Sequence, residues 1–158
     1  MDLENALEKA LSLRNALATE VENARGERQL LGNLDANGLF ARAAQRGEFL
    51  ADVARIEREL VDFLARATDT AGVSEISLTK LRALFPREGE VLVRTLSEIR
   101  SLAGALNEVN RLNQQLAGRA LACVRGYLDA LHPTPRAYDR RGTRAFSAPA
   151  LAMVSSKG

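Results

Sequence analysis

The sequence predicts an all-α fold, an elongated antiparallel three-helix bundle or coiled coil with a short extra helix and a disordered C-terminal tail. Apolar residues make up 46% of the 158 residues, while aromatic residues make up 4% and tryptophan is absent. Ala, Leu, Arg and Glu dominate, which favours helical and coiled-coil proteins. Apolar residues also recur at alternating spacings of three and four, the pattern of packed helices. A chain of this length is long enough for one core.

The first two predicted helices form a hairpin. The first begins after Asp2, a favourable N-cap residue, and ends near Asn33. Its stripe is Leu3, Leu7, Ala10, Leu17, Val21, Ala24 and Leu31. Residues 33–38 are rich in Asn, Asp and Gly and are expected to form a turn. The second helix runs from about Asn37 to Ala67, with a stripe of Leu39, Ala43, Leu50, Val53, Leu60 and Leu64.

The third long helix is the strongest coiled-coil signal in the chain. A linker leads to a short helix, Leu78 to Phe85, which Ser77 caps and Pro86 ends. The third helix then runs from about Glu88 to Leu131. Its seam keeps the three-and-four spacing unbroken: Leu92, Leu96, Ile99, Ala103, Leu106, Asn110, Asn113, Ala117, Ala120, Val124, Tyr127 and Leu131. A second apolar stripe lies beside it: Leu102, Val109, Leu112, Leu116, Cys123 and Leu128.

Helix lengths predict an exposed apolar end. At about 1.5 Å per residue the third helix spans roughly 65 Å, whereas each of the first two spans roughly 45–50 Å. If the three pack antiparallel in sequence, the C-terminal turns of the third helix extend past the others. That end carries Val124, Tyr127, Leu128 and Leu131. A contiguous exposed apolar surface of this kind indicates a binding partner.

The chain divides into a helical domain, residues 1–132, and a basic tail, residues 133–158. Of the 22 basic and 20 acidic residues, five basic and one acidic lie in the tail, so the tail carries +4 and the rest −2. The body therefore has no general affinity for nucleic acid. Ordering the tail costs on the order of 30 kcal/mol of backbone entropy. Its five large apolar side chains return at most about 15 kcal/mol, so we expect it to be disordered when free.

Composition and spacing argue against an enzyme or a metal site. The first residues of the sequence are acidic and open directly into a helical pattern. No apolar run approaches the length of a membrane helix. One cysteine cannot form an internal disulfide, so a cytoplasmic protein is expected. Cys123 and His132, the only residues of their kind, lie nine apart on one helix and cannot form a nucleophile–base pair. Zinc would lack ligands. Cys123 is expected to be a core thiol, and no catalytic residue or cofactor is predicted.

Two asparagines in the seam of the third helix have two interpretations. In one, the amides of Asn110 and Asn113 hydrogen-bond the backbone of a bound chain. In the other, they set the register inside the bundle or rotate out to solvent. In either case we expect that replacing both with Leu leaves the free protein at least as stable, because an apolar residue normally stabilises a coiled-coil seam relative to Asn.

Two short motifs resemble those of a known family. The segment Asn107-Glu-Val-Asn110-Arg-Leu-Asn113-Gln-Gln-Leu116 is similar to the paired-asparagine motif of the FlgN-type flagellar export chaperones. About twenty residues further on, Tyr138-Asp-Arg-Arg-Gly142 resembles the Tyr-x-x-x-Gly signature of that family. The layout is also similar over nearly the whole chain: two long helices, a short Leu-rich segment and a very long third helix.

The resemblance implies a function and a set of site residues. Such chaperones hold the C-terminal helical segments of the hook–filament junction proteins, prevent premature assembly, and deliver these clients, in a 1:1 complex, to the type III export gate. By position, Tyr138 matches the tyrosine associated with docking on the cytoplasmic domain of the gate. The client surface would lie on the third helix, at Leu106, Val109, Asn110, Leu112, Asn113, Leu116, Ala120 and Val124.

Two other functions fit parts of the sequence. A structural coiled-coil adaptor without an export role would use the same seam of the third helix for self-association, and would form a tight dimer alone. A nucleic-acid-binding regulator would work through the four arginines of the tail, and its DNA retention would depend on salt and vanish when residues 133–158 are deleted.

Overall fold

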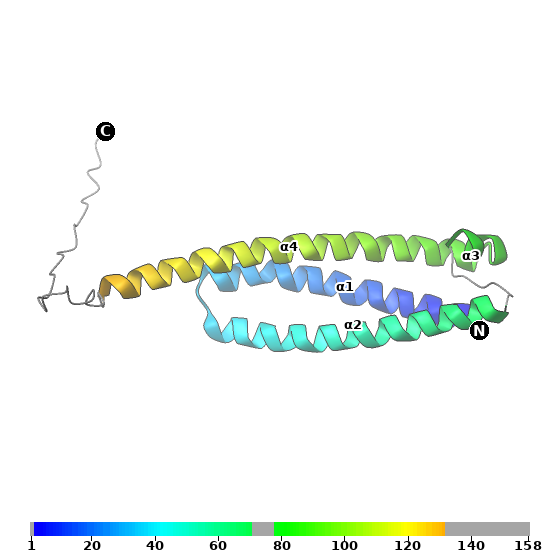
Figure 1. The fold of residues 1–158 in the computed structure, drawn as a ribbon, viewed down its shortest axis with the longest axis horizontal. Helices are drawn as coiled ribbons and strands as arrows, with labels where there is room; N and C mark the ends of the chain where they lie inside the picture. Colours follow the sequence, from blue (N-terminus) through cyan, green and yellow to red (C-terminus); the bar gives the residue numbers. More distant parts are fainter. Residues whose placement is uncertain (1, 71–77, 132–158) are drawn as a thin grey trace, which may run out of the picture. The chain divides into compact units, whose positions relative to one another are not determined.

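The computed structural model describes residues 2–70 and 78–131. Four helices follow one another: α1 (Asp2–Gly32), α2 (Ala36–Thr70), α3 (Leu78–Leu84) and α4 (Glu88–Leu131) (Figure 1). The prediction of an all-α fold built from long packed helices is confirmed. The chain divides into two compact units, Met1–Ala120 and Leu121–Gly158. The tail after Leu131, including His132 and Tyr138, lies outside the described residues, and the predicted domain boundary at residue 132 stays a prediction.

A C-capping motif turns the chain between α1 and α2. The backbone N–H of Leu34 donates to the carbonyl of Leu31 over 3.3 Å, and that of Asp35 donates to Leu30 over 3.0 Å. This Schellman arrangement places Leu34 at a positive φ of 55°, a conformation that glycine normally occupies. Asp35 then caps α2, because its Oδ1 accepts a 2.9 Å bond from the N–H of Gly38.

The Asp35 cap explains why α2 begins at Ala36, one residue before the predicted start. Gly38 was expected in the turn, but it lies inside the first turn of the helix. A Cβ atom at Gly38 would lie 2.6 Å from the carboxylate of Asp35 and 2.8 Å from Leu30. A larger residue at this position would therefore displace the capping carboxylate of Asp35 and the side chain of Leu30, and glycine avoids both contacts.

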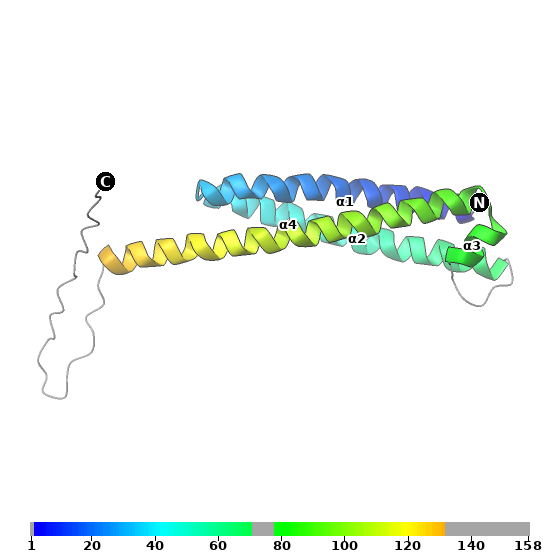
Figure 2. The same cartoon turned by 90° about the horizontal axis from the view of Figure 1, so that it is seen from above.

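Contacts between side chains define the directions of the helices in residues 1–120. Lys9 of α1 pairs with Glu59 of α2, whereas Glu27, further along α1, pairs with Arg46, nearer the start of α2. These two helices are therefore antiparallel. Arg14 of α1 pairs with Glu98 of α4, and Glu27 bonds Asn113 further along both helices. Hence α1 and α4 are parallel, giving the up–down–up order (Figures 1 and 2).

The buried seam of α1 keeps the three-and-four spacing without interruption. It comprises Leu3, Ala6, Ala10, Leu13, Leu17, Glu20, Ala24 and Glu27, with Val21 buried beside it. The predicted stripe contained Leu3, Ala10, Leu17, Val21 and Ala24 but missed Ala6 and Leu13. Leu7 is only partly buried against the core. The seam ends in two carboxylates, which an apolar pattern does not reveal.

The predicted stripe of α2 was partly wrong. Its core side carries buried Arg42, Ile56, Leu60, Leu64 and Ala67 and partly buried Arg46, Phe49, Val53 and Phe63. Ala43 and Leu50, which the pattern placed in the stripe, are exposed. After half-buried Leu39, the next two core positions of α2 are Arg42 and Arg46, so exposed apolar residues in this half of the helix lie on other sides.

The third predicted helix is α4, with the predicted bounds. The N–H of Gly89 donates to the carbonyl of Phe85 over 2.8 Å, and Phe85 packs against the core. The side of α4 that packs on the core runs between the two predicted stripes. It takes residues from both, with Leu92, Thr95, Leu106, Val109 and Asn113 buried and Ile99, Leu102, Leu116 and Ala120 partly buried.

Candidate functional site

Four charged residues occupy core positions where the end of α1 meets the start of α2. Glu20 and Glu27 of α1 are only 3% and 6% exposed, and Arg42 of α2 is 6% exposed. Arg46, one helical turn further along α2, is half-buried. Two carboxylates and two guanidinium groups balance in charge, so the layer carries no net charge. We call these four residues and the two seam asparagines of α4 the polar layer.

Both arginines of the polar layer bind both carboxylates. The Nη2 of Arg42 bonds the carboxylate of Glu20, and its Nε lies 3.1 Å from that of Glu27. The Nη2 of Arg46 donates to Glu27 over 2.6 Å, and its Nε lies 3.5 Å from Glu20. The Nη1 of Arg42 is buried and has no hydrogen-bond partner among the described residues. Removing one partner from such a buried cluster leaves an uncompensated charge, which is strongly destabilising.

The paired asparagines of α4 complete the polar layer. Asn113 is buried, and its Nδ2 donates to the carbonyl of Ala24 over 2.6 Å and to Glu27 over 3.0 Å. Its Oδ1 accepts a 3.4 Å bond from Arg28. Asn110 is half-buried, and its Oδ1 accepts a 3.2 Å bond from Arg46. In the free chain the amide of Asn113 therefore bonds α1 and that of Asn110 bonds α2. This agrees with the interpretation that places both asparagines inside the bundle.

The charged members of the asparagine motif pair with each other on the outside of α4. Arg111 donates two bonds to Glu108, of 2.9 Å and 2.7 Å. These bonds hold the pKa of Glu108 below its ordinary value and that of Arg111 above it. The motif thus has a buried amide side facing α1 and α2 and an exposed ionic side.

The predicted client residues of α4 fall into three groups. Leu106, Val109 and Asn113 are buried in the bundle. Asn110, Leu112, Leu116 and Ala120 are half-buried, and Val124 is exposed. A client can reach the buried three only if α4 moves away from the core, whereas the others present part of their surface in the free chain. Their role in client binding stays a prediction.

The final described stretch of α4, residues 121–131, is exposed throughout. Leu121, Val124, Leu128 and Leu131 follow the spacing three, four, three and so share one side of the helix, with Tyr127 at its edge. Exposure of these side chains reaches 66% at Tyr127. The prediction of Cys123 as a core thiol is wrong: Cys123 is exposed and free. Leu121 belonged to neither predicted stripe, although its three-and-four spacing to Val124 and Leu128 was visible.

The described part of the chain holds neither a metal site nor a membrane span. Among residues 2–70 and 78–131, no three or more His, Cys, Asp and Glu residues are grouped so as to hold a metal ion. No helix in the same ranges is both long and apolar enough to cross a bilayer. The candidate binding features are therefore on helices: an apolar side over residues 121–131, and the polar layer where α1, α2 and α4 meet.

Comparison with known proteins decides the family. The FlgN protein family matches residues 1–145, which includes all four helices, the polar layer and both motifs. This chain belongs to the FlgN family. No curated protein and no solved structure shows a significant match to it. The resemblance inferred from the two motifs is thereby confirmed.

Membership defines the general role of this FlgN-family chain. The family comprises flagellar export chaperones rather than enzymes, and its members bind flagellar hook-associated proteins. In this FlgN-family chain the asparagine motif lies where all three long helices meet, and its amides bond the other two. The asparagine motif, the part of the sequence most specific for the family, therefore also makes the contacts that hold α4 against α1 and α2.

Proposed function

We propose that this chain binds the C-terminal helical segments of flagellar hook-associated proteins, prevents their premature assembly and delivers them to the type III export gate. Family membership supports the class of client and the export role. The proposed client surface lies on α4 and comprises the residues implied by the resemblance, Leu106, Val109, Asn110, Leu112, Asn113, Leu116, Ala120 and Val124, together with Leu121, Tyr127, Leu128 and Leu131.

The observation that carries the proposal is the exposed apolar side of residues 121–131. Leu121, Val124, Leu128 and Leu131 present anchors at the spacing by which an amphipathic helix recognises another. Burying one such side chain is worth about 1.5–3 kcal/mol. The opposite side carries the small residues Ala122 and Gly126, and Arg125 and Asp129 lie between the two sides, so the large apolar side chains are confined to one face. A client helix that covers the apolar face needs no catalytic group and no cofactor.

Docking on the export gate is assigned to the tail. Tyr138 is the proposed docking residue because it begins the Tyr-x-x-x-Gly segment, and the surrounding arginines give the tail its positive charge. The tail and α4 then have separate partners, one the gate and the other the client. Such a division lets a chaperone present a held client to the gate.

The client proposal is tested by two double variants with equal change in charge. Leu121→Asp/Leu128→Asp places two carboxylates on the apolar face, whereas Ala122→Asp/Ala130→Asp places two on the other side of the same turns. Titration calorimetry against C-terminal segments of hook-associated proteins should show that the first variant binds with at least about tenfold lower affinity than the wild type. The second should bind as the wild type does.

Circular dichroism and sedimentation complete the test. Both variants should keep the helicity of the wild type, because residues 121–131 are exposed in the free chain. Equal client affinity in the two variants would contradict the assignment. A tight dimer that dissociates with Leu121→Asp/Leu128→Asp and binds no hook-associated protein would instead support the coiled-coil adaptor.

A further inference from the structure

Helix α2 has a second apolar side that faces solvent. Phe40, Leu50 and Val61 are 78%, 59% and 57% exposed, although they are large hydrophobic side chains on a helix of 35 residues. Phe40 and Val61 lie on the side opposite to Ile56 and Leu60, which pack in the core, and Leu50 lies on the flank of this side. Between Phe40 and Val61 the same side carries exposed Ala44, Gly47, Ala51 and Ala54, and an exposed apolar side of this kind on a folded helix indicates a partner. This side belongs neither to the polar layer nor to the proposed client surface on α4.

The exposed side of α2 follows a heptad repeat. Phe40, Gly47, Ala54 and Val61 recur every seven residues, and Ala44, Ala51, Arg58 and Ala65 follow each of them by four. These are the two core positions of a coiled coil. One flank of the repeat carries Ala41, Glu48, Arg55 and Asp62. The repeat extends over four heptads, which is long enough for a two-helix interface.

We propose that this side of α2 binds the same side of α2 in a second copy of the chain, in antiparallel orientation. Aligning the two repeats about their common centre pairs Phe40 with Ala65 of the second copy, Ala44 with Val61 and Gly47 with Arg58. Ala51 and Ala54 meet at the middle. Each large side chain thus faces a small one, which is the condition for close packing of two helices.

Charges on the flank select the same alignment. In it Glu48 lies opposite Arg55 of the second copy, and symmetry makes this pair twice. Shifting the alignment by one heptad either way places Glu48 opposite Glu48 or Arg55 opposite Arg55. A parallel pair places Arg58 against Arg58. Like charges facing each other are destabilising, so size and charge independently favour one orientation and one register.

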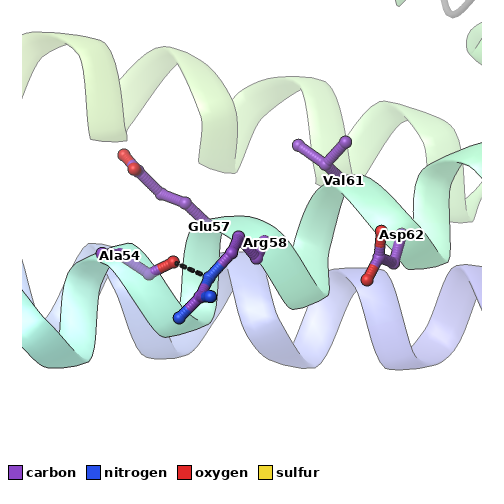
Figure 3. A pocket seen from close by; sticks show the side chains of 5 residues that line it. All are labelled: Ala54, Glu57, Arg58, Val61 and Asp62. Atoms are coloured by element: carbon purple, nitrogen blue, oxygen red, sulfur yellow. Dashed lines mark hydrogen bonds between the residues drawn. The ribbon is translucent and has the colours of Figure 1, made fainter.

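Gly47 and Arg58 match each other in this arrangement. No heavy atom lies within 4 Å of the position that a Cβ atom of Gly47 would take, so packing within the chain does not require glycine there. Glycine inside a helix is destabilising relative to alanine. Arg58 bends back along α2, where its Nε donates to the carbonyl of Ala54 over 3.1 Å beside a shallow hollow that Val61 also lines (Figure 3). The missing side chain of Gly47 leaves room for the stem of Arg58 from the second copy.

This self-association is distinct from the one that a coiled-coil adaptor requires. It uses α2 and leaves every proposed client residue of α4 outside the interface. It also does not rest on the proposed function, because its evidence is confined to α2. A client complex would then contain two chaperone chains and two clients.

The test is the mass of the full chain in solution, measured by sedimentation equilibrium over a range of concentrations. The wild type should be a dimer. Gly47→Arg should be a monomer, because it puts a second guanidinium against Arg58 of the other copy. At concentrations where both proteins are monomers, the melting temperature of Gly47→Arg should not be lower than that of the wild type. Arg is a better helix former than Gly, and the site is open. A loss of dimer in this variant is therefore not a loss of fold.

Charge exchange tests the register. Glu48→Arg and Arg55→Glu should each raise the dimer dissociation constant by about tenfold or more, because each replaces two attractions by two repulsions. The double variant Glu48→Arg/Arg55→Glu should restore the wild-type value. Glu8→Arg, the same charge change on an exposed position of α1, is the control and should have no effect. A wild type that stays monomeric, or a dimer that survives Gly47→Arg, would overturn the proposal.

Discussion

The side-chain amide of Asn113 on α4 donates a 3.0 Å hydrogen bond to the carboxylate of Glu27 on α1. Glu27 is in turn held by Arg42 and Arg46 of α2. One buried carboxylate thus connects all three long helices. The position of α4 along α1 is therefore specified by a polar contact with one acceptable register, whereas an apolar seam tolerates several.

Asn113 is expected to stabilise the free chain, contrary to the inference from spacing alone. Asn113→Leu removes two donated hydrogen bonds, one to a carboxylate, and should lower the free energy of unfolding by about 1–3 kcal/mol. Chemical denaturation measures the change. Asn107→Leu, the same substitution at an exposed position of the same motif, is the control and should leave the free energy of unfolding nearly unchanged. An Asn113→Leu variant as stable as the wild type would show that the amide acts only on the client.

The ion pairs of the polar layer should be strongly coupled. Arg42→Leu leaves the buried carboxylate of Glu20 with only the Nε of Arg46, 3.5 Å away. The substitution should lower the free energy of unfolding by about 3–5 kcal/mol. Glu20→Leu/Arg42→Leu removes both charges and should cost less than Arg42→Leu alone. A double-mutant cycle in urea isolates this coupling. Additive effects of the two single substitutions would mean that the buried pair contributes nothing specific.

The turn between α1 and α2 offers a stabilising substitution. Leu34 is exposed and lies at a φ of 55°, where an L-residue with a Cβ atom is disfavoured by roughly 1–2 kcal/mol. Leu34→Gly should therefore raise the free energy of unfolding by about 1 kcal/mol. Leu34→Ala keeps the Cβ atom and should not raise it. Thermal melts of the three proteins decide the point, and a lower melting temperature for the glycine variant would contradict it.

The contact of Lys9 with Glu59, 2.7 Å long, should make stability depend on pH. The hydrogen bond from Lys9 is the main cause that holds the pKa of Glu59 below its ordinary value of 4.5, and Arg55 adds to it. A carboxyl group with a depressed folded pKa contributes stability above its unfolded pKa and loses it as pH falls through the folded pKa. Lys9→Met should therefore be less stable than the wild type at neutral pH.

The difference between Lys9→Met and the wild type should shrink as the pH falls from 4.5 through the lower folded pKa of wild-type Glu59, because protonation of the carboxylate removes the ion pair with Lys9. Urea denaturation at a series of pH values follows this change. The matched variant Lys80→Met replaces an exposed lysine of α3 and should show no such dependence. A deficit that persists unchanged in acid would point to lost packing of the lysine stem rather than to the ion pair.

Deleting residues 133–158 should separate the two proposed partners. The truncated chain should bind hook-associated segments as the wild type does and fail to bind the cytoplasmic domain of the export gate. Tyr138→Ala should reproduce most of that loss, since one buried aromatic anchor carries about 2 kcal/mol or more of an interface. Titration calorimetry of the wild type, the truncated chain and Tyr138→Ala against both partners measures the two affinities. Loss of client affinity on truncation, with gate affinity retained, would reject the division between α4 and the tail.

The sequence by itself determined the fold class, the number of helices and most of their ends. Periodic apolar spacing over long stretches, with Pro86 after the short helix, was enough because these signals are local to each helix. Asp2 was predicted to cap the first helix, whereas α1 begins at Asp2 itself. The bounds of α4 were predicted without error, and α2 began one residue early because Asp35 caps it. The asparagine motif and the Tyr138 segment together identified the family.

Only the tertiary structure decided which side of each helix is buried. A helix with apolar residues on more than one side does not show which side is buried until its neighbours are placed, so Leu50 of α2 was assigned to the core and Leu13 of α1 was missed. Glu20, Glu27, Arg42 and Arg46 read as surface charges along the chain, because a charge can be buried only where an opposite charge from another helix meets it. Asn113 belongs to that cluster for the same reason. Its partners lie more than eighty residues away in sequence, and packing alone brings them together.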